Sequence, residues 1–182
     1  MTTLLVLLRG INVGGRNKIG MTELRQAFAD MGFAEPRTYI QSGNVVMGSR
    51  RANSPRTVAA IERALSETFG YEARVVVRDL AQMTTVVRQI PKDWDVGDAS
   101  MRYNVLFTSH RLTPKQLIAQ LKPKPNIESV RAGAQALYWS APFATVTKTA
   151  MVKISAHPAY GELTIRNLRT TLALLDLMRG RG

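Results

Sequence analysis

The chain has 182 residues, of which 45% are hydrophobic and 21% charged, so it can bury a core as one compact domain or two small ones, and disorder is not expected. No apolar stretch reaches the roughly 20 residues of a membrane span, and the start Met1-Thr2-Thr3 lacks the cationic region of a secretory signal, so we expect a cytoplasmic protein that does not contact membranes. The absence of cysteine excludes disulfides, thiolate nucleophiles and zinc-thiolate sites.

The net charge of +12 and the pI near 10.7 favour contact with phosphates, whether of nucleic acid, a nucleotide or an acidic partner. Arg and Lys are scattered along the chain and do not form one basic run, so solubility explains the charge equally well. A small anionic ligand and nucleic acid therefore both stay open as partners, and nucleic acid is not favoured.

The first part of the chain predicts the order strand, helix, strand, strand, helix, strand. The first helix has Leu24 and Phe28 on one face and ends at Gly32, and the second begins at the cap Ser54, with Pro55 in its first turn. The strands are expected at residues 4–8, 37–41, 45–48 and 73–78, with a tight turn at residues 42–44.

A further helix begins at the cap Asp79 and ends at Pro91, and the polar, turn-rich segment 92–102 follows it. We interpret this segment as a linker. The predicted domains are therefore residues 1–91 and residues 103–182.

The second part of the chain repeats the order of the first. Strands are expected at residues 103–108, 127–131, 136–140 and 163–165, and helices from Thr113-Pro114 to Leu121 and around residues 146–154. A final helix carries Leu168, Leu172 and Leu175 at helical spacing. The fold class that this order predicts is α+β, with two tandem ferredoxin-like (βαββαβ) halves, antiparallel sheets and an extra C-terminal helix.

The candidate site is the glycine-rich basic loop that follows the first strand, from Arg9 to Lys18. Its glycines expose backbone amides and its cations favour an anion. The corresponding link in the second half, residues 109–112, is short and contains no glycine, so the long loop exceeds what the fold requires.

Three segments of the chain resemble a known bacterial family. They are Leu7-Leu8-Arg9-Gly10-Ile11-Asn12-Val13-Gly14-Gly15, then Thr38-Tyr39-Ile40-Gln41-Ser42-Gly43-Asn44-Val45-Val46, and Thr164-Ile165-Arg166-Asn167 with Thr170. They are similar to segments of the "domain of unknown function 1697" proteins, although Leu168 stands where that family commonly has an aromatic residue. The resemblance implies two ferredoxin-like halves in a small cytosolic protein, and no known activity.

If the three motifs mark one site, they converge near the first helix and bind phosphate or carboxylate. The predicted ligand-binding residues are Arg9, Gly10, Asn12, Gly14, Gly15, Lys18, Ser42, Gly43, Asn44, Arg166 and Asn167. A purely structural interpretation competes with this one: the glycines turn the chain, Asn44 serves a hairpin, and Arg166-Asn167 caps the last helix. The spacing matches neither a P-loop nor a dinucleotide fingerprint.

The remaining candidates for catalysis or metal binding are expected to have structural roles, and no cofactor or metal is expected. His110 and His157 lack a nearby carboxylate, and Ser42 has no assignable base. The acidic residues Asp93, Asp95 and Asp98 lack the glycine and terminal glutamate of a calcium loop.

Two function classes remain, and whether the protein is an enzyme is left open. An enzyme acting on a phosphorylated or acylated small molecule is supported only by fold analogy with acylphosphatases. A module that binds RNA or single-stranded DNA on an open sheet face needs aromatic platforms. The candidates for these platforms are Tyr103, Phe107, Tyr138 and Trp139, which we expect instead to fill the core.

Overall fold

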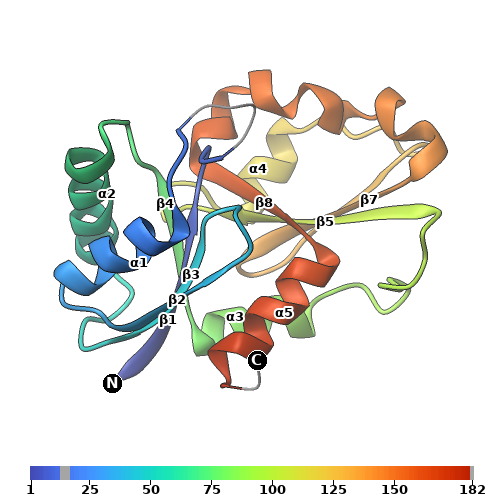
Figure 1. Cartoon of the computed structure of the whole chain (residues 1–182). Helices are drawn as coiled ribbons and strands as arrows, with labels where there is room; N and C mark the ends of the chain where they lie inside the picture. The colour runs from blue at the N-terminus through green and yellow to red at the C-terminus, as the bar shows by residue number, and fades with distance from the viewer. Residues whose placement is uncertain (13–16, 181–182) are drawn as a thin grey trace. The chain divides into compact units, whose positions relative to one another are not determined.

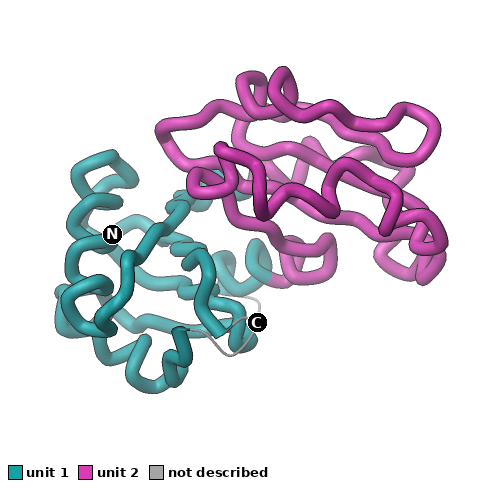
Figure 2. The backbone as a smooth tube through the Cα atoms, turned by 90° about the horizontal axis from the view of Figure 1, so that it is seen from above, with its two compact units in different colours: residues 1–83, 174–182 teal, residues 84–173 magenta. Residues whose placement is uncertain are grey.

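The computed structural model describes residues 1–12 and 17–180 (Figure 1). The protein is α+β, with two four-stranded antiparallel sheets and several helices. It divides into unit 1, residues 1–83 and 174–182, and unit 2, residues 84–173 (Figure 2). The predicted linker 92–102 lies inside unit 2, and its role as a linker stays a prediction.

Unit 1 holds the first sheet and the two helices that pack on it. The strands are β1 (Thr2–Leu8), β2 (Ala34–Tyr39), β3 (Asn44–Ser49) and β4 (Val75–Asp79), and the helices are α1 (Met21–Asp30) and α2 (Pro55–Phe69). The strand order is β2-β3-β1-β4, so β1 is central and pairs with both β3 and β4. The loop after β1 therefore starts from a central strand.

The core of unit 1 lies between one face of this sheet and the two helices. Leu4, Val6 and Leu8 alternate along β1 and pack with Leu24 of α1 and Ile61 of α2, all at most 1% exposed. Alternation places these β1 side chains on one face of the strand. The intervening Leu5 and Leu7 are fully buried as well, which agrees with the continuous apolar run of a central strand.

Helix α2 begins and ends as its sequence predicts. Ser54 has extended backbone and its side chain accepts a hydrogen bond from the Thr57 amide, while Pro55 stands in the first turn. Gly70 ends the helix in the left-handed conformation, with φ +66°.

Unit 2 holds the second sheet. Helices α3 (Leu80–Arg88) and α5 (Leu168–Met178) contribute residues to both units. The other elements are β5 (Met101–Thr108), α4 (Pro114–Gln120), β6 (Ser129–Ala132), β7 (Ala136–Pro142), three 3₁₀ helices η1 (Phe143–Lys148), η2 (Ala150–Ala156) and η3 (Pro158–Glu162), and β8 (Leu163–Asn167). The strand order is β6-β7-β5-β8, with β5 central.

The one helix predicted around residues 146–154 is instead divided between two 3₁₀ helices, because this segment forms parts of η1 and η2. Thr149 between them has extended backbone, with φ −74° and ψ 160°. The amide of Ala150 donates to the Glu128 carboxylate at 2.7 Å, which gives that amide a partner outside the segment. Apolar spacing alone does not reveal such a distant partner.

Glu128 is a buried carboxylate that joins three parts of unit 2. It accepts hydrogen bonds from the Trp139 indole at 2.6 Å, from the Lys124 amide at 3.0 Å and from the Ala150 amide. Burial raises the pKa of Glu128, but these hydrogen bonds outweigh it and hold the pKa below its ordinary value. The Glu128 carboxylate thus links the segment before β6, strand β7 and the start of η2 through hydrogen bonds.

The aromatic side chains on the second sheet are mostly core residues, as expected. Phe107, Tyr138 and Trp139 are at most 2% exposed, and Tyr103 is half-buried with its ring centroid 4.9 Å from that of Trp94. They do not provide the open stacking face that a module of the predicted type would need.

In the part of the chain that the structure describes, no helix is long and apolar enough to cross a membrane.

Candidate functional site

A pocket of about 500 Å³ lies where the loop after β1 meets the start of α1 in unit 1. The segments that line it are the loop itself, the first residues of α1 and the turn between β2 and β3. Its lining residues are Asn12, Lys18, Ile19, Gly20, Met21 and Gln41. We call it the loop pocket. The first two family-like motifs therefore contribute to one cavity.

Asn12 holds the walls of the loop pocket together. Its Nδ2 donates to the carbonyl oxygens of Ile19 and Gln41, both at 3.0 Å, and its Oδ1 accepts from the Ile19 amide at 2.9 Å. Its backbone is left-handed, with φ 54°, a conformation that Asn tolerates. Asn12 thus joins the loop to the β2-β3 turn, a structural role besides any contact with a ligand.

The loop is closed by a second asparagine. The Asn12 amide donates to the Asn17 carbonyl at 3.1 Å, and Nδ2 of Asn17 donates to the Gly10 carbonyl at 3.0 Å. Gly10 itself has φ +69°, which favours glycine. The described ends of the loop are therefore fixed to each other.

The turn residues 42–44 are held in place by hydrogen bonds to one another and to neighbouring segments. Asn44 is fully buried, and its Nδ2 donates to the Tyr39 carbonyl and to Ser42 Oγ, both at 2.9 Å. Gly43 has φ +73°, and its carbonyl accepts from the Leu8 amide at 2.7 Å. These three predicted ligand-binding residues lie beside the loop and outside the pocket lining.

Lys18 is the exposed cation that lines the loop pocket. Arg9 is half-buried outside the lining, and its amide donates to the Arg74 carbonyl at 3.0 Å. Glu23 brings a negative charge to the start of α1, where its Oε2 accepts from the Gly20 amide at 3.4 Å. An anion at this helix end would therefore compete with Glu23. Gly14 and Gly15 lie outside the described residues.

The third motif lies in unit 2. Arg166 is 8% exposed, and its Nη1 donates to Thr164 Oγ1 and to the Ile165 carbonyl, both at 2.8 Å. Burial lowers the pKa of Arg166 to about 10. Asn167 Oδ1 accepts from the Thr170 amide at 2.8 Å, so Asn167 caps α5. The convergence of this motif with the other two stays a prediction.

Sequence reasoning missed Gln41 and the apolar lining of the loop pocket. Gln41 lies within the second motif, immediately before the predicted residues Ser42 and Gly43, so its place in that motif could have identified it as a candidate site residue. Ile19, Gly20 and Met21 follow the chosen loop directly. Extending the candidate site to the first turn of α1 would have included them.

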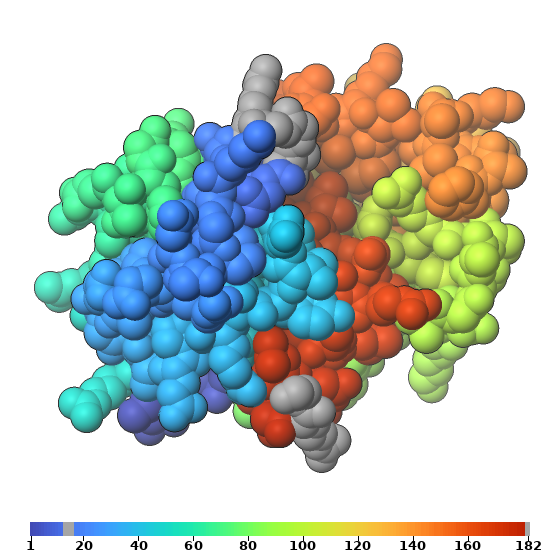
Figure 3. Space-filling model, in the orientation of Figure 1, coloured from blue at the N-terminus to red at the C-terminus, as the bar shows by residue number. Residues whose placement is uncertain are grey.

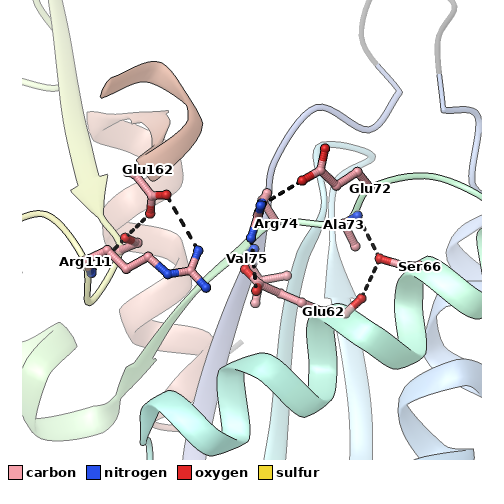
Figure 4. Close-up of polar contacts among 9 residues, drawn as sticks. Glu62, Ser66, Glu72, Ala73, Arg74, Val75, Arg111 and Glu162 are labelled. Atoms are coloured by element: carbon pink, nitrogen blue, oxygen red, sulfur yellow. Dashed lines mark hydrogen bonds and ion pairs between the residues drawn. The ribbon is translucent and has the colours of Figure 1, made fainter. Parts of the chain in front are cut away.

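Several other polar clusters have structural roles. In unit 1, Arg74 forms ion pairs with Glu62 at 3.7 Å and with Glu72 at 2.7 Å (Figure 4). In unit 2, Glu162 pairs with Arg111 at 3.6 Å and accepts a hydrogen bond from Ser109 Oγ. The more exposed of these pairs, Arg74–Glu72 and Arg111–Glu162, stabilise by roughly 0–1 kcal/mol.

The remaining sequence candidates also take part in local structure. His157 Nδ1 accepts from the Ala159 amide at the start of η3. Asp95 and Asp98 each accept the amide two residues ahead, as in Asx turns. Among the described residues, no group of three or more His, Cys, Asp or Glu side chains is arranged to hold a metal ion.

The chain is similar along nearly its whole length to a solved structure, the conserved bacterial protein SP0830 from Streptococcus pneumoniae. The two share 28% sequence identity with a TM-score of 0.84, over 97% of this chain and 98% of that one. No curated protein matches the sequence. Residues 1–138, which include the first two motifs but not the third, match the family described as protein of unknown function (DUF1697). The chain therefore belongs to the DUF1697 family.

Proposed function

We propose that the protein binds a small phosphorylated or carboxylated ligand in the loop pocket. The observation that carries the proposal is that two separate motifs line one cavity, with the Lys18 cation and the amide side chains of Asn12 and Gln41 around it. A volume of about 500 Å³ is within the range of small-molecule sites. The net charge of +12 would favour the approach of an anion.

Binding is proposed in preference to catalysis. Among the described residues that line the pocket, Lys18 is the one ionisable side chain, so no second group is placed there as an acid or base. Lys18 would supply charge, and Gln41 a neutral hydrogen-bonding group, while Asn12 keeps the two walls at a fixed separation.

We also propose that each sheet with its covering helices is one ferredoxin-like half. The orders β2-β3-β1-β4 and β6-β7-β5-β8 are the same order when the strands of each half are numbered from its beginning. In both cases the first strand is central and pairs antiparallel with the third and fourth.

A cytoplasmic location is a separate proposal, which rests on the sequence composition.

The ligand proposal is tested by thermal unfolding with inorganic phosphate and a panel of phosphorylated and carboxylated small molecules. A ligand at one hundred times its Kd stabilises by about 2.7 kcal/mol. For a protein of this size, that shifts the Tm by roughly 5–10 °C. Sodium chloride at matched ionic strength serves as the reference for each titration.

Lys18→Gln should reduce the shift, and Lys115→Gln provides the matched control. Lys115 is equally an exposed lysine, but it lies on α4 in unit 2. An unchanged Tm across the whole panel would refute the proposal. Equal losses in the two variants would also refute it, because they would indicate a general charge effect.

A further inference from the structure

A second pocket, of about 370 Å³, lies at the beginning of β5 in unit 2. In Figure 3 the red surface of the start of α5 adjoins the yellow-green surface of the segment leading into β5. We call this cavity the β5 pocket. Its polar and aromatic lining residues are Asp98, Arg102, Tyr103, Phe143, Asn167 and Arg169.

Phe143 presents an aromatic ring to solvent in this pocket. It is 60% exposed, whereas Phe107 and Trp139 of the same unit are at most 1% exposed. Leaving a large apolar side chain exposed forgoes the free energy of burying it, and exposed aromatic side chains are the platforms on which bases stack in proteins that bind single-stranded nucleic acid. The ring is therefore available for stacking on a planar group.

Two exposed arginines stand beside the ring. Arg102 lies on β5, and Arg169 lies in the first turn of α5. A cation in the first helical turn faces the positive end of the helix macrodipole, so Arg169 occupies an unfavourable position for helix stability. Asp98 supplies a negative charge, and its Oδ1 accepts from the amide and hydroxyl of Ser100.

Arg102 also lines an adjoining pocket of about 310 Å³. The other polar groups of that pocket include Asn104, Thr147 and Thr149, and its apolar wall includes Trp139. Two cavities that share one lining arginine suit a chain of repeating units better than a single compact molecule. The shared arginine would then contact the group that links one unit to the next.

The fold itself does not require this combination of Arg102, Phe143 and Arg169, which we call the Arg-Phe cluster. In each sheet the residue that precedes the helix after the last strand is paired with a residue of the central strand. The pair is Leu4 and Asp79 in unit 1 and Asn104 and Asn167 in unit 2, so Leu4 corresponds to Asn104 and Asp79 to Asn167. By the corresponding registers, the positions of the cluster are occupied in unit 1 by Thr2, Arg51 and Ala81. Unit 1 thus builds the same sheet order with no aromatic ring and no helix-start cation at these positions.

We propose that unit 2 binds single-stranded nucleic acid at the Arg-Phe cluster. Arg102 and Arg169 contact backbone phosphates, and one base stacks on Phe143. A positive groove with an exposed aromatic ring is the common arrangement for single strands, because every base has a face that can stack. This site is separate from the loop pocket and does not depend on the ligand proposed there.

The test is fluorescence anisotropy of the full-length protein with labelled single-stranded RNA and DNA of about 12 nucleotides, a length within the range of such sites. We expect binding that weakens as salt rises. Arg102→Gln and Arg169→Gln should each weaken it and reduce the slope of log K against log salt by about 0.7. Arg63→Gln is the matched control, because Arg63 is an exposed arginine on α2 in unit 1.

The aromatic contribution is tested separately. Phe143→Leu keeps an apolar side chain but removes the ring, and it should weaken binding by roughly 5-fold to 160-fold, as expected for loss of one stacked base. Phe143→Trp should retain binding. Thermal unfolding of each variant shows whether the fold is intact.

Four results would overturn the proposal. The first is no binding of either single strand at low salt, and the second is equal weakening by Arg63→Gln and Arg102→Gln. The third is an unchanged affinity in Phe143→Leu. The fourth is a preference for duplex or for a free mononucleotide over the single strand, which would contradict an extended single-stranded ligand.

Discussion

Arg78 and Arg166 occupy the same position in the two sheets. Arg78 on β4 is paired with Leu5 of β1, and Arg166 on β8 is paired with Val105 of β5. Each donates from Nη1 to the carbonyl of the residue before it, at 2.8 Å in both cases. The two side chains are 6% and 8% exposed.

The residues after the two arginines correspond as well. Asp79 Oδ1 accepts from the Gln82 amide and Asn167 Oδ1 from the Thr170 amide, both at 2.8 Å, so each caps the helix that follows. The repeated sequence is Arg78-Asp79-Leu80 and Arg166-Asn167-Leu168. The two halves thus share a short motif as well as a strand order, and sequence reasoning missed the first copy.

We predict that Arg78→Lys and Arg166→Lys destabilise the protein by similar amounts. Each guanidinium is buried, and this desolvation lowers the pKa of both arginines to about 10. Lysine is more strongly hydrated and lacks the planar guanidinium. Loss of hydrogen bonds to a buried charged group costs about 1.5–3 kcal/mol, measurable by urea denaturation.

Arg63→Lys, at an exposed position on α2, should change stability by at most about 0.5 kcal/mol. If Arg166→Lys is as stable as the natural protein, the guanidinium geometry is not needed. If only one of the two variants is destabilised, the two positions are not equivalent.

The regular elements were largely predictable because their signals are local. The apolar run at residues 4–8 became β1, and the cap Ser54 with Pro55 marked the start of α2. The strand expected at residues 37–41 is displaced and runs from Ala34 to Tyr39, since Ile40 has φ 47° and leaves the extended conformation. A β-branched residue in that conformation is exceptional and cannot be anticipated from propensity.

The sequence pointed to the loop beside which a pocket lies, and that this pocket binds a ligand stays a prediction. Loop length and composition pointed to residues 9–18, and Asn12 and Lys18 line a pocket there. The bond from Asn12 to Gln41 joins residues far apart in sequence, so the role of Asn12 as a brace depends on tertiary structure. The β5 pocket was missed because Arg102, Phe143 and Arg169 belong to separate segments without a shared motif.

We predict that Gly43→Ala is strongly destabilising. A Cβ at this position would lie 2.8 Å from Leu8 Cβ and 2.9 Å from Ile11 Cδ1, and the backbone has φ +73°. The left-handed conformation and the overpacking together should cost about 2–4 kcal/mol. Chemical denaturation measures this difference directly.

Gly70→Ala is the matched control for this substitution. Gly70 has nearly the same φ, +66°, but nothing lies within 4 Å of an added Cβ. It should therefore cost only about 1 kcal/mol. Equal effects of the two substitutions would show that packing against Leu8 and Ile11 is unimportant.

We predict that Tyr71→Phe stabilises the protein by about 1 kcal/mol at neutral pH. The buried hydroxyl of Tyr71 has no hydrogen-bond partner among the described residues, and such a group costs about 1–3 kcal/mol. Tyr138→Phe is the control, because the Tyr138 hydroxyl donates to the Val86 carbonyl at 2.7 Å and its loss should destabilise. Destabilisation by Tyr71→Phe would contradict the prediction.

The same tyrosine gives a pH dependence. Burial raises the pKa of Tyr71 from 10 to about 12, so the native state holds this proton where the unfolded chain releases it. Ionisation of Tyr71 therefore has no effect on stability below about pH 10 and lowers stability as pH rises from 10 to 12. Denaturation across this range should show a smaller loss of stability in Tyr71→Phe, and an identical loss would refute the assigned pKa shift.

We predict that Arg169→Gln stabilises the protein while it weakens nucleic-acid binding. Arg169 lies in the first turn of α5, where a cation opposes the helix macrodipole, so its removal should stabilise by about 0.3–1 kcal/mol at low ionic strength. Arg179 follows the other end of the same helix, and Arg179→Gln should have the opposite sign. Both effects should shrink as salt rises, because these positions are exposed.

Thermal unfolding and oligonucleotide anisotropy on the same samples separate the two properties: a variant that is more stable but binds less tightly has lost a binding contact and not its fold. A variant that loses stability and affinity together would instead place Arg169 among the structural residues.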